Sequence, residues 1–378
     1  MKHVDEYRDR SLALVLAEKI ARAAHGRRQY KLMEFCGGHT HAISRYGITD
    51  LLPKNVDMIH GPGCPVCVLP TGRIDNAIEL AAGNPLTLCT YADMLRVPAS
   101  GRSSLMQAKA RGADVRMVYS VADALRLAQE HPGRETVFFA IGFETTAPST
   151  ALAIRTAERL QLKNFSVFCN HVRTPPAMAE ILRAPQLPGG GVDGVVGPGH
   201  VSCVIGSRPY EQVAEKYRRP VVIAGFEPLD VMQTVLMLLR QINQNRHEVE
   251  NEYTRAVTRE GNTKAQELME EVFELRRSFE WRGLGEIAHS AYRIRPGYGR
   301  FDAERRYGIA YRRAADNKAC ECGAILRGEK APRDCRVFGT VCTPENPLGA
   351  CMVSSEGACA AHYSYGRFRE TAMAETAV

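Results

Sequence analysis

The chain has 378 residues, of which 45% are hydrophobic and 24% charged, and a formal net charge of +7. This length predicts two or three domains, and this composition excludes an intrinsically disordered chain. Twelve cysteines are too sparse for a disulfide scaffold, and the apolar run at residues 12–17 is too short for a signal peptide or a membrane span. We therefore expect a cytoplasmic protein without a membrane partner, whose clustered cysteines are metal ligands or redox thiols.

The order of the expected elements predicts an α/β fold. A helical pattern covers residues 4–25, and short apolar β-prone runs then alternate with helical stretches, as in parallel sheets with crossover helices. Helical periodicity continues over residues 229–257 and 263–281, before Gly, Pro and Arg become frequent. The expected strands are residues 31–35, 56–60, 86–90, 115–119, 136–141, 166–170, 192–196 and 220–224.

One segment of the chain is repeated. Residues 56–64 (VDMIHGPGC) match residues 192–200 (VDGVVGPGH) in register, and apolar runs beginning at Pro85 and Pro220 follow at nearly the same offset. This predicts two related, Rossmann-like α/β domains whose Gly-Pro-Gly turns lie at strand carboxyl ends, where open α/β sheets bind ligands. We assign them to residues 1–120 and 121–228, facing a cleft. Residues 229–378 form a third domain, part helical and part cysteine-rich loop, that holds an iron-sulfur cluster.

Two early loops place sulfur beside glycine. Cys36 and His39 follow the first expected strand, so a thiolate and an imidazole can reach one metal; a buried cysteine beside a structural histidine is the alternative. Cys64 and Cys67 form a Cys-x-x-Cys motif after the second strand, which favours a reactive dithiol. A zinc site shared with Cys36 and His39 is the alternative there.

The tail between residues 320 and 359 carries six further cysteines. Four thiolates suffice to hold a cubane iron-sulfur cluster, which leaves two for a redox pair. Spacing leaves the ligands open, since positions 320/335/342/359 and 322/335/342/351 are both geometrically possible, and a Cys₄ zinc site is the alternative to iron. The six are Cys320, Cys322, Cys335, Cys342, Cys351 and Cys359.

A third loop, residues 142–146 (GFETT), follows an apolar strand, and residues 225–227 repeat its first three residues. Such a loop can bring the carboxylate of Glu144 and the hydroxyls of Thr145 and Thr146 to a cleft; alternatively, a threonine caps the next helix. The remaining cysteines lie in or near apolar strands and are expected to be small core residues. They are Cys89, Cys169 and Cys203.

The charge pattern does not predict nucleic-acid binding. Basic residues are scattered except at residues 293–313, where seven arginines accompany Asp302 and Glu304, and an ion-paired or solvated face is the commoner meaning of such a stretch. The chain also contains no P-loop, no Gly-x-Gly-x-x-Gly after its first strand and no Gly-x-Ser-x-Gly elbow. Nucleotide and serine hydrolysis therefore lack their usual support.

Five motifs in order make the chain resemble the HypD family of [NiFe]-hydrogenase expression/formation proteins. The resemblance runs nearly end to end, and the combination of motifs is far more specific than any one of them. The motifs are residues 36–41 (CGGHTH), 61–67 (GPGCPVC), 142–146 (GFETT), 197–202 (GPGHVS) and 351–359 (CMVSSEGAC).

This resemblance implies a redox-active scaffold rather than a conventional turnover enzyme, and a monomer when no partner is bound. The Fe(CN)₂CO group of [NiFe]-hydrogenase would be assembled on it with the chaperone HypC, while HypE delivers cyanide that HypF makes from carbamoyl phosphate. Cys36 would be a thiolate ligand of that iron, His39 would ligate or orient it, and Cys64 and Cys67 would form a dithiol relay. A stand-alone iron-sulfur-dependent thiol-disulfide reductase is the alternative.

The same resemblance assigns the tail cysteines. Cys320, Cys335, Cys342 and Cys359 would hold a [4Fe-4S] cluster, and Cys322 and Cys351 would form a disulfide that exchanges electrons with it. Attaching cyanide from a thiocyanate-like carrier requires electrons, which gives a reason for two sulfur sites. The further candidate cleft residues are His41, Glu144, Thr145, Thr146, His200 and Glu356.

Overall fold

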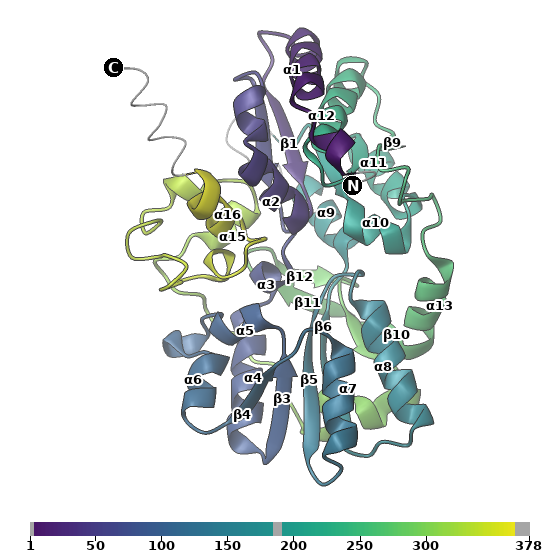
Figure 1. Ribbon diagram of the computed structural model, residues 1–378, viewed down its shortest axis with the longest axis vertical. Coiled ribbons are helices and arrows are strands. Elements are labelled where there is room, and N and C mark those ends of the chain that lie inside the picture. Colours follow the sequence, from purple (N-terminus) through teal and green to yellow (C-terminus); the bar gives the residue numbers. More distant parts are fainter. Residues whose placement is uncertain (1–3, 184–190, 367–378) are drawn as a thin grey trace.

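The structure is a computed structural model that describes residues 4–183 and 191–366. Two parallel sheets lie one above the other with their helices, and the cysteine-rich tail packs beside their junction (Figure 1). Across these residues, no helix combines the length and the apolar character that crossing a membrane requires.

The first sheet has five parallel strands in the order β2-β1-β7-β8-β9. Leu32 and Val196 pack on one face against α1 (Arg10–Ala23), α2 (Gly37–Tyr46) and α12 (Pro228–Asn243). Met33 and Val195 pack on the other face against α9 (Thr174–Arg183) and α11 (Glu211–Tyr217). The strands are β1 (Tyr30–Glu34), β2 (Val56–His60), β7 (Gly194–Pro198), β8 (Val221–Ala224) and β9 (Val249–Asn251).

The second sheet has four parallel strands in the order β4-β3-β5-β6. One face packs against α4 (Thr71–Gly83) and α6 (Leu105–Ala110). The other packs against α7 (Val121–Glu130) and α8 (Ala147–Arg159), on which α13 (Thr263–Val272) rests. The strands are β3 (Leu86–Thr90), β4 (Asp114–Met117), β5 (Glu135–Gly142) and β6 (Phe165–His171).

The eight expected strands are confirmed to within two residues, but they are grouped differently from the prediction. Residues 1–120 and 121–228 each give strands to both sheets, so the sheets do not follow a boundary at residue 120. The repeat does not mark two halves either. Its two copies contain β2 and β7, which pair in parallel with the two sides of β1. Both copies therefore belong to the first sheet and not to different domains.

Two of the expected helices end early. α12 stops at Asn243, and β9 then completes the first sheet, so residues 229–251 do not belong to a separate domain. α13 stops at Val272 and is followed by β10 (Phe273–Leu275) and β11 (Ser278–Trp281), which pair with β13 (Tyr292–Ile294) and β12 (Gly285–Ala288). Over so short a stretch, apolar spacings of two and of three to four residues overlap, and cross-strand pairing decides between them.

The first helical segment is also divided. A 3-10 turn, η1 (Asp5–Arg8), precedes α1, and the Asp9 side chain caps α1 by accepting a hydrogen bond from the Leu12 amide (2.9 Å).

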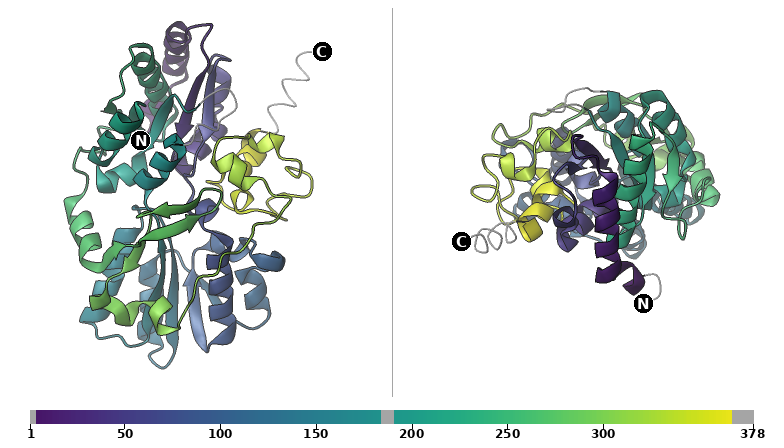
Figure 2. Two further views of the ribbon diagram at one scale, coloured as in Figure 1. Left: turned by 180° about the vertical axis from the view of Figure 1, so that it is seen from behind. Right: turned by 90° about the horizontal axis from the view of Figure 1, so that it is seen from above.

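The tail reaches its place along an extended segment that crosses α4. Gly72 leaves room for this segment, since a side chain there would collide with the Arg312 backbone, and Asn76 donates a hydrogen bond to the Ala310 carbonyl (3.1 Å). The tail then packs α16 (Ala358–Ala361) against α2, and η7 (Ala350–Met352) against α3 (Pro65–Val68). Figure 2 shows the tail against the flank where both sheets meet.

Candidate functional site

A pocket of about 610 Å³ lies between the carboxyl ends of the two sheets. The loops after β1, β2 and β7 line it from the first sheet, and the loops after β3 and β5 line it from the second. In each sheet these loops follow neighbouring strands whose connections run in opposite directions, which is where open α/β sheets bind ligands. Residues 354–356 of the tail close one side.

Cys36 is the thiol at the base of this pocket. It is the N-cap residue of α2 and is only 5% exposed. Burial raises the pKa of its thiol to about 12, and the Glu356 carboxyl adds to the rise, while the amides of Gly38 and His39 act in the opposite direction. The free thiol is therefore protonated at neutral pH, and a bound cation would be needed to hold it as thiolate.

A buried carboxylate fixes the backbone beneath Cys36. Glu34 is fully buried and accepts hydrogen bonds from the Cys36 amide (2.8 Å) and from the Thr40 hydroxyl. His60 Nδ1 lies 3.0 Å from the same carboxylate, so the ends of β1 and β2 are tied together. Glu34 is a carboxylate at the carboxyl end of β1, directly after the apolar residues Leu32 and Met33, and that position is the one signal by which sequence could have identified it.

The imidazole that faces Cys36 is that of His200, not that of His39. His200 Nδ1 lies 3.7 Å from the Cys36 sulfur, and burial lowers the pKa of His200 to about 4, so its ring is neutral. His39 lies behind it, where Nε2 donates to the Ala224 carbonyl (3.1 Å). Phe226 stacks on both rings, with centroid distances of 3.8 Å to His200 and 4.9 Å to His39. His39 therefore packs against Phe226, the ring on which His200 rests, and does not itself face the Cys36 sulfur.

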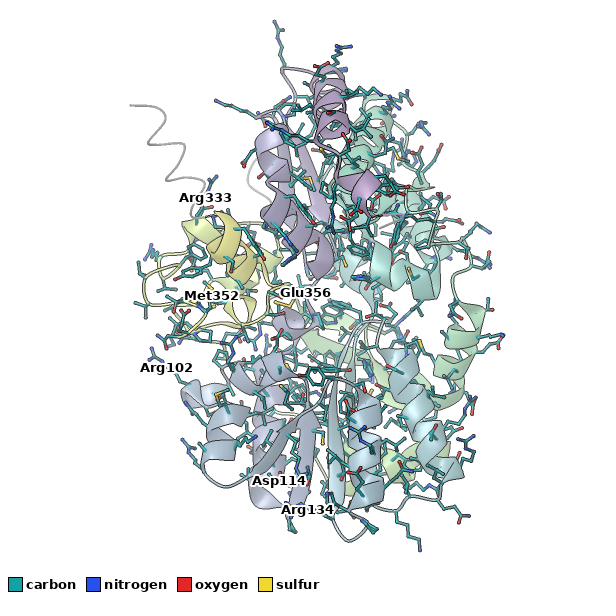
Figure 3. All side chains as sticks on the ribbon, in the orientation of Figure 1. Arg102, Asp114, Arg134, Arg333, Met352 and Glu356 are labelled. Carbon is teal, nitrogen blue, oxygen red and sulfur yellow. A yellow bond between two sulfur atoms is a disulfide. The ribbon has the colours of Figure 1, made fainter. Side chains whose placement is uncertain are left out.

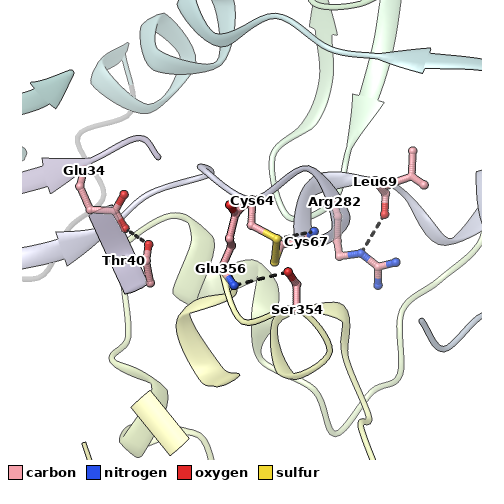
Figure 4. Close-up of a disulfide and its surroundings, with 8 residues drawn as sticks. All are labelled: Glu34, Thr40, Cys64, Cys67, Leu69, Arg282, Ser354 and Glu356. Carbon is pink, nitrogen blue, oxygen red and sulfur yellow. Dashed lines mark hydrogen bonds between the residues drawn. A yellow bond between two sulfur atoms is a disulfide. The ribbon is translucent and has the colours of Figure 1, made fainter. Parts of the chain in front are cut away.

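Cys64 and Cys67 form a disulfide (Figure 4), and Gly63, the residue before it, packs against the Cys36 backbone. The Cα atoms of the two bonded cysteines are 5.2 Å apart, across the first turn of α3. A side chain on Gly63 would collide with the Cys36 backbone, its Cβ lying 2.7 Å from the Cys36 Cα, so only glycine lets the two loops meet. The Gly63 carbonyl also accepts a hydrogen bond from the Gly37 amide (3.1 Å).

The GFETT loop divides between two pockets. Thr145 and Thr146 line the pocket with Cys36, and Thr146 also occupies the N-cap position of α8, although its side chain makes no capping hydrogen bond there. Glu144 instead lines a neighbouring pocket of about 440 Å³, and its carboxylate accepts hydrogen bonds from the amide and hydroxyl of Thr174. His41 also lies outside the pocket, with its ring edge-on to Tyr365.

The cysteines outside the motifs follow the prediction in part. Cys89 in β3 and Cys169 in β6 are buried core residues, as expected. Cys203 is different, because it lies on α10 (Gly199–Ile205), is partly exposed and lines the pocket with Cys36.

The six tail cysteines lie in one packed cluster with the disulfide segment. Cys322 is within hydrogen-bonding reach of Cys320, Cys351 and Cys359, and Cys342 lies close enough to Cys320 and Cys335 for their charges to interact. None of the six is in a disulfide.

The donor set of this cluster fits an iron-sulfur group in its chemistry. Thiolates are the ligands that such groups take, and Gly349 forms a cradle, because a side chain there would occupy the space of the Cys320 and Cys322 sulfurs. Among the described residues, no three Cys, His, Asp or Glu side chains are already arranged around one metal position. The six tail cysteines therefore lie close together, but their arrangement does not show which four of them would bind an iron-sulfur group.

Comparison with known proteins identifies the family. A family model described as HypD, hydrogenase formation hypA family, matches residues 11–366. The chain belongs to the HypD family. It is 64% identical to the hydrogenase maturation factor HypD of Cupriavidus necator over 98% of both chains. It is 48% identical to that of Escherichia coli K12, over 97% of this chain and 98% of the relative. The chain therefore takes part in hydrogenase maturation.

The HypD motifs that the sequence separates are brought together here. Residues of all five motifs line the pocket, and Glu356 brings the last of them to Cys36. Figure 3 places Glu356 at the inner edge of the tail, where the tail meets both sheets. Three contributors could not be recognised from sequence: His60, the stacked ring of Phe226, and Arg282 next to the disulfide segment.

Proposed function

We propose that this chain is the scaffold on which the Fe(CN)₂CO group of [NiFe]-hydrogenase is assembled. The observation that carries the proposal is a buried thiol that faces a neutral imidazole in one pocket of about 610 Å³, whose wall includes Pro65 and Val66, the residues between the two cysteines of a disulfide. Iron is the substrate of this site. Soft thiolate and imidazole ligands suit low-spin iron, and they are supplied by Cys36 and, in place of the expected His39, by His200.

The charges around the pocket support the binding of a cation. Glu356 and Asp93 line it, and Glu34 lies directly beneath Cys36. Burial and these neighbouring acids raise the pKa of Glu356, and a positive ion bound beside its carboxyl would act in the opposite direction. Iron binding would remove the proton from the Cys36 thiol, and the pocket opening would release it to solvent.

The partners follow from family membership. A HypC-type chaperone would supply another ligand from outside the pocket, and HypE, with HypF upstream, would deliver cyanide. The free volume above Cys36 supports this arrangement, because it leaves room for a partner's side chain and for small diatomic ligands.

The tail would provide electrons. Cys320, Cys335, Cys342 and Cys359 would hold a [4Fe-4S] cluster, which when bound supplies electrons one at a time, and Cys322 and Cys351 would form the adjoining redox pair. The packing of η7, which contains Cys351, against α3, which contains Cys67, supports thiol-disulfide exchange between tail and pocket. A disulfide takes up two electrons and two protons to become two thiols.

An infrared spectrum of the chain purified with its chaperone tests the proposal. Metal-bound cyanide and carbonyl absorb where protein does not, and we expect these bands to disappear in Cys36→Ala. Cys169→Ala, which removes a buried strand thiol, is the matched control and should keep them. Bands that survive Cys36→Ala would contradict the scaffold.

The two sulfur sites can be separated in the same samples. Cys36→Ala should leave the visible absorbance of the tail unchanged, and Cys342→Ala should bleach it and lower solubility. Equal loss of both signals in Cys36→Ala would contradict a two-site arrangement. Turnover of a disulfide substrate without any partner, with tolerance of Cys36→Ala, would favour the reductase instead.

A further inference from the structure

Arg282 contacts the chain just after the Cys64–Cys67 disulfide. It lies in the turn between β11 and β12 and is only 4% exposed. Its amide donates a hydrogen bond to the Val68 carbonyl (2.8 Å), and its Nε donates to the Leu69 carbonyl (3.0 Å). Figure 4 shows the guanidinium next to the Leu69 carbonyl, with its outer nitrogens pointing away from the disulfide. Arg282 thereby fixes the segment that leads out of α3.

The same turn also contacts the tail. Arg282 Nη1 pairs with Asp316, which precedes Cys320 in the chain. Gly283 packs directly on Gly323, next to Cys322, and a side chain at Gly283 would place its Cβ 2.6 Å from the Gly323 Cα. The turn at residues 282–283 therefore contacts both the segment that follows the Cys64–Cys67 disulfide and the tail next to Cys322.

The guanidinium of Arg282 retains one unused donor. Nη2 is buried and has no hydrogen-bond partner among the described residues, although an arginine keeps its charge at any physiological pH. Arg282 lines a cavity together with residues 315–318, which lead to Cys320, and with Leu348, next to the Gly349 cradle of the Cys320 and Cys322 sulfurs. The positive charge therefore lies beside the segments that carry the tail sulfurs.

We propose that Arg282 is the positioning residue that holds the two sulfur sites together and keeps a fixed positive charge against the tail thiolates. The inference rests on the proposed function, since it requires an iron-sulfur group on the tail. Four thiolate ligands make such a group anionic, and its reduction adds a further negative charge. A buried cation nearby stabilises the reduced form more than the oxidised form.

The test measures the reduced fraction of the iron-sulfur group at a fixed solution potential, by visible absorbance, in the anaerobically purified full chain. Arg282→Met should lower the ratio of reduced to oxidised protein about tenfold, which is about 59 mV for a one-electron couple. Arg282→Lys keeps the charge and should lower the ratio less than about threefold. Arg293→Met is the control, because Arg293 lies in β13 and pairs with Glu274 rather than with the tail, and it should leave the ratio unchanged.

An unchanged ratio in Arg282→Met, or an equal fall in Arg293→Met, overturns the inference. If Arg282→Met does not fold, Asp316→Asn carries the test: it leaves the Arg282 charge uncompensated, so the ratio should rise, and a fall or no change overturns the inference. A wild-type chain that binds no iron on the tail overturns the proposed electron supply together with this inference. A chain that binds iron but ignores Arg282 overturns the inference alone.

Discussion

Replacing Glu34 by glutamine should destabilise the chain measurably, because one buried carboxylate satisfies three donors. It accepts hydrogen bonds from the Cys36 amide and the Thr40 hydroxyl and bonds the His60 ring. A glutamine offers a single acceptor oxygen and turns an N–H₂ group toward a donor. Hydrogen bonds to a charged group contribute about 1.5–3 kcal/mol each, so we expect a loss of about 2–4 kcal/mol.

That loss can be read as a melting temperature. At about 2.1 cal/mol/K per residue, unfolding of 378 residues carries an entropy of about 0.8 kcal/mol/K, so a loss of about 3 kcal/mol lowers Tm by about 4 °C. Calorimetry of Glu34→Gln should be compared with Glu18→Gln, which removes an exposed carboxylate on α1. If both variants melt within about 1 °C of each other, the hydrogen-bond reasoning for Glu34 is wrong.

Two further perturbations test the packing and the ionisation of this region. Gly37→Ala should push away Glu356, because the carboxylate oxygen of Glu356 lies 2.7 Å from the position of the added Cβ. Cys36 should then be alkylated faster in mass-spectrometric time courses. Gly26→Ala, where the added Cβ meets open space, should leave the alkylation rate unchanged. Burial raises the pKa of Cys36 and of Cys89 to about 12 in the folded chain, whereas the thiols of the unfolded chain ionise near about 8.5. The free energy of unfolding should therefore be unaffected by these thiols below about pH 8.5. Above that pH it should fall by about 1.4 kcal/mol per pH unit for each thiol. Urea titrations from pH 8 to 10.5 should show that the free energy of unfolding declines less steeply with pH in Cys89→Ala than in the unchanged chain. An equal slope in the two proteins would refute the raised pKa of Cys89.

The local order of the chain was readable from its sequence, because parallel strands buried on both faces are apolar throughout. The runs that became β5 and β6 show this, since nearly every residue in them is buried. The pairing of strands was not readable. β1 lies between β2 and β7, and its contact with β7 joins residues some 160 positions apart, which no local pattern encodes.

The site residues that have a distinctive side-chain type and spacing could be predicted from the sequence. The residues whose role depends on which neighbour they contact could not. The thiols of Cys36, Cys64 and Cys67 declare themselves by type and spacing. The choice of His200 over His39 depends on which ring faces the sulfur, and that is set by the stacking of Phe226 from a third loop. For the same reason Glu144 was misplaced: the direction of its side chain is fixed by Thr174, far along the chain.

The interleaving of the two sheets has a consequence for the nascent chain. Cys36 is synthesised with β1, whereas His200 and Glu356, which enclose it, follow some 160 and 320 residues later. At roughly 5–20 residues per second, translation reaches Glu356 roughly 15–60 s after Cys36. During that interval the thiol has neither its carboxyl neighbour nor its completed sheet. A sulfur atom that ends almost inaccessible is thus open to oxidants, metals and early-binding helpers while the ribosome is still at work.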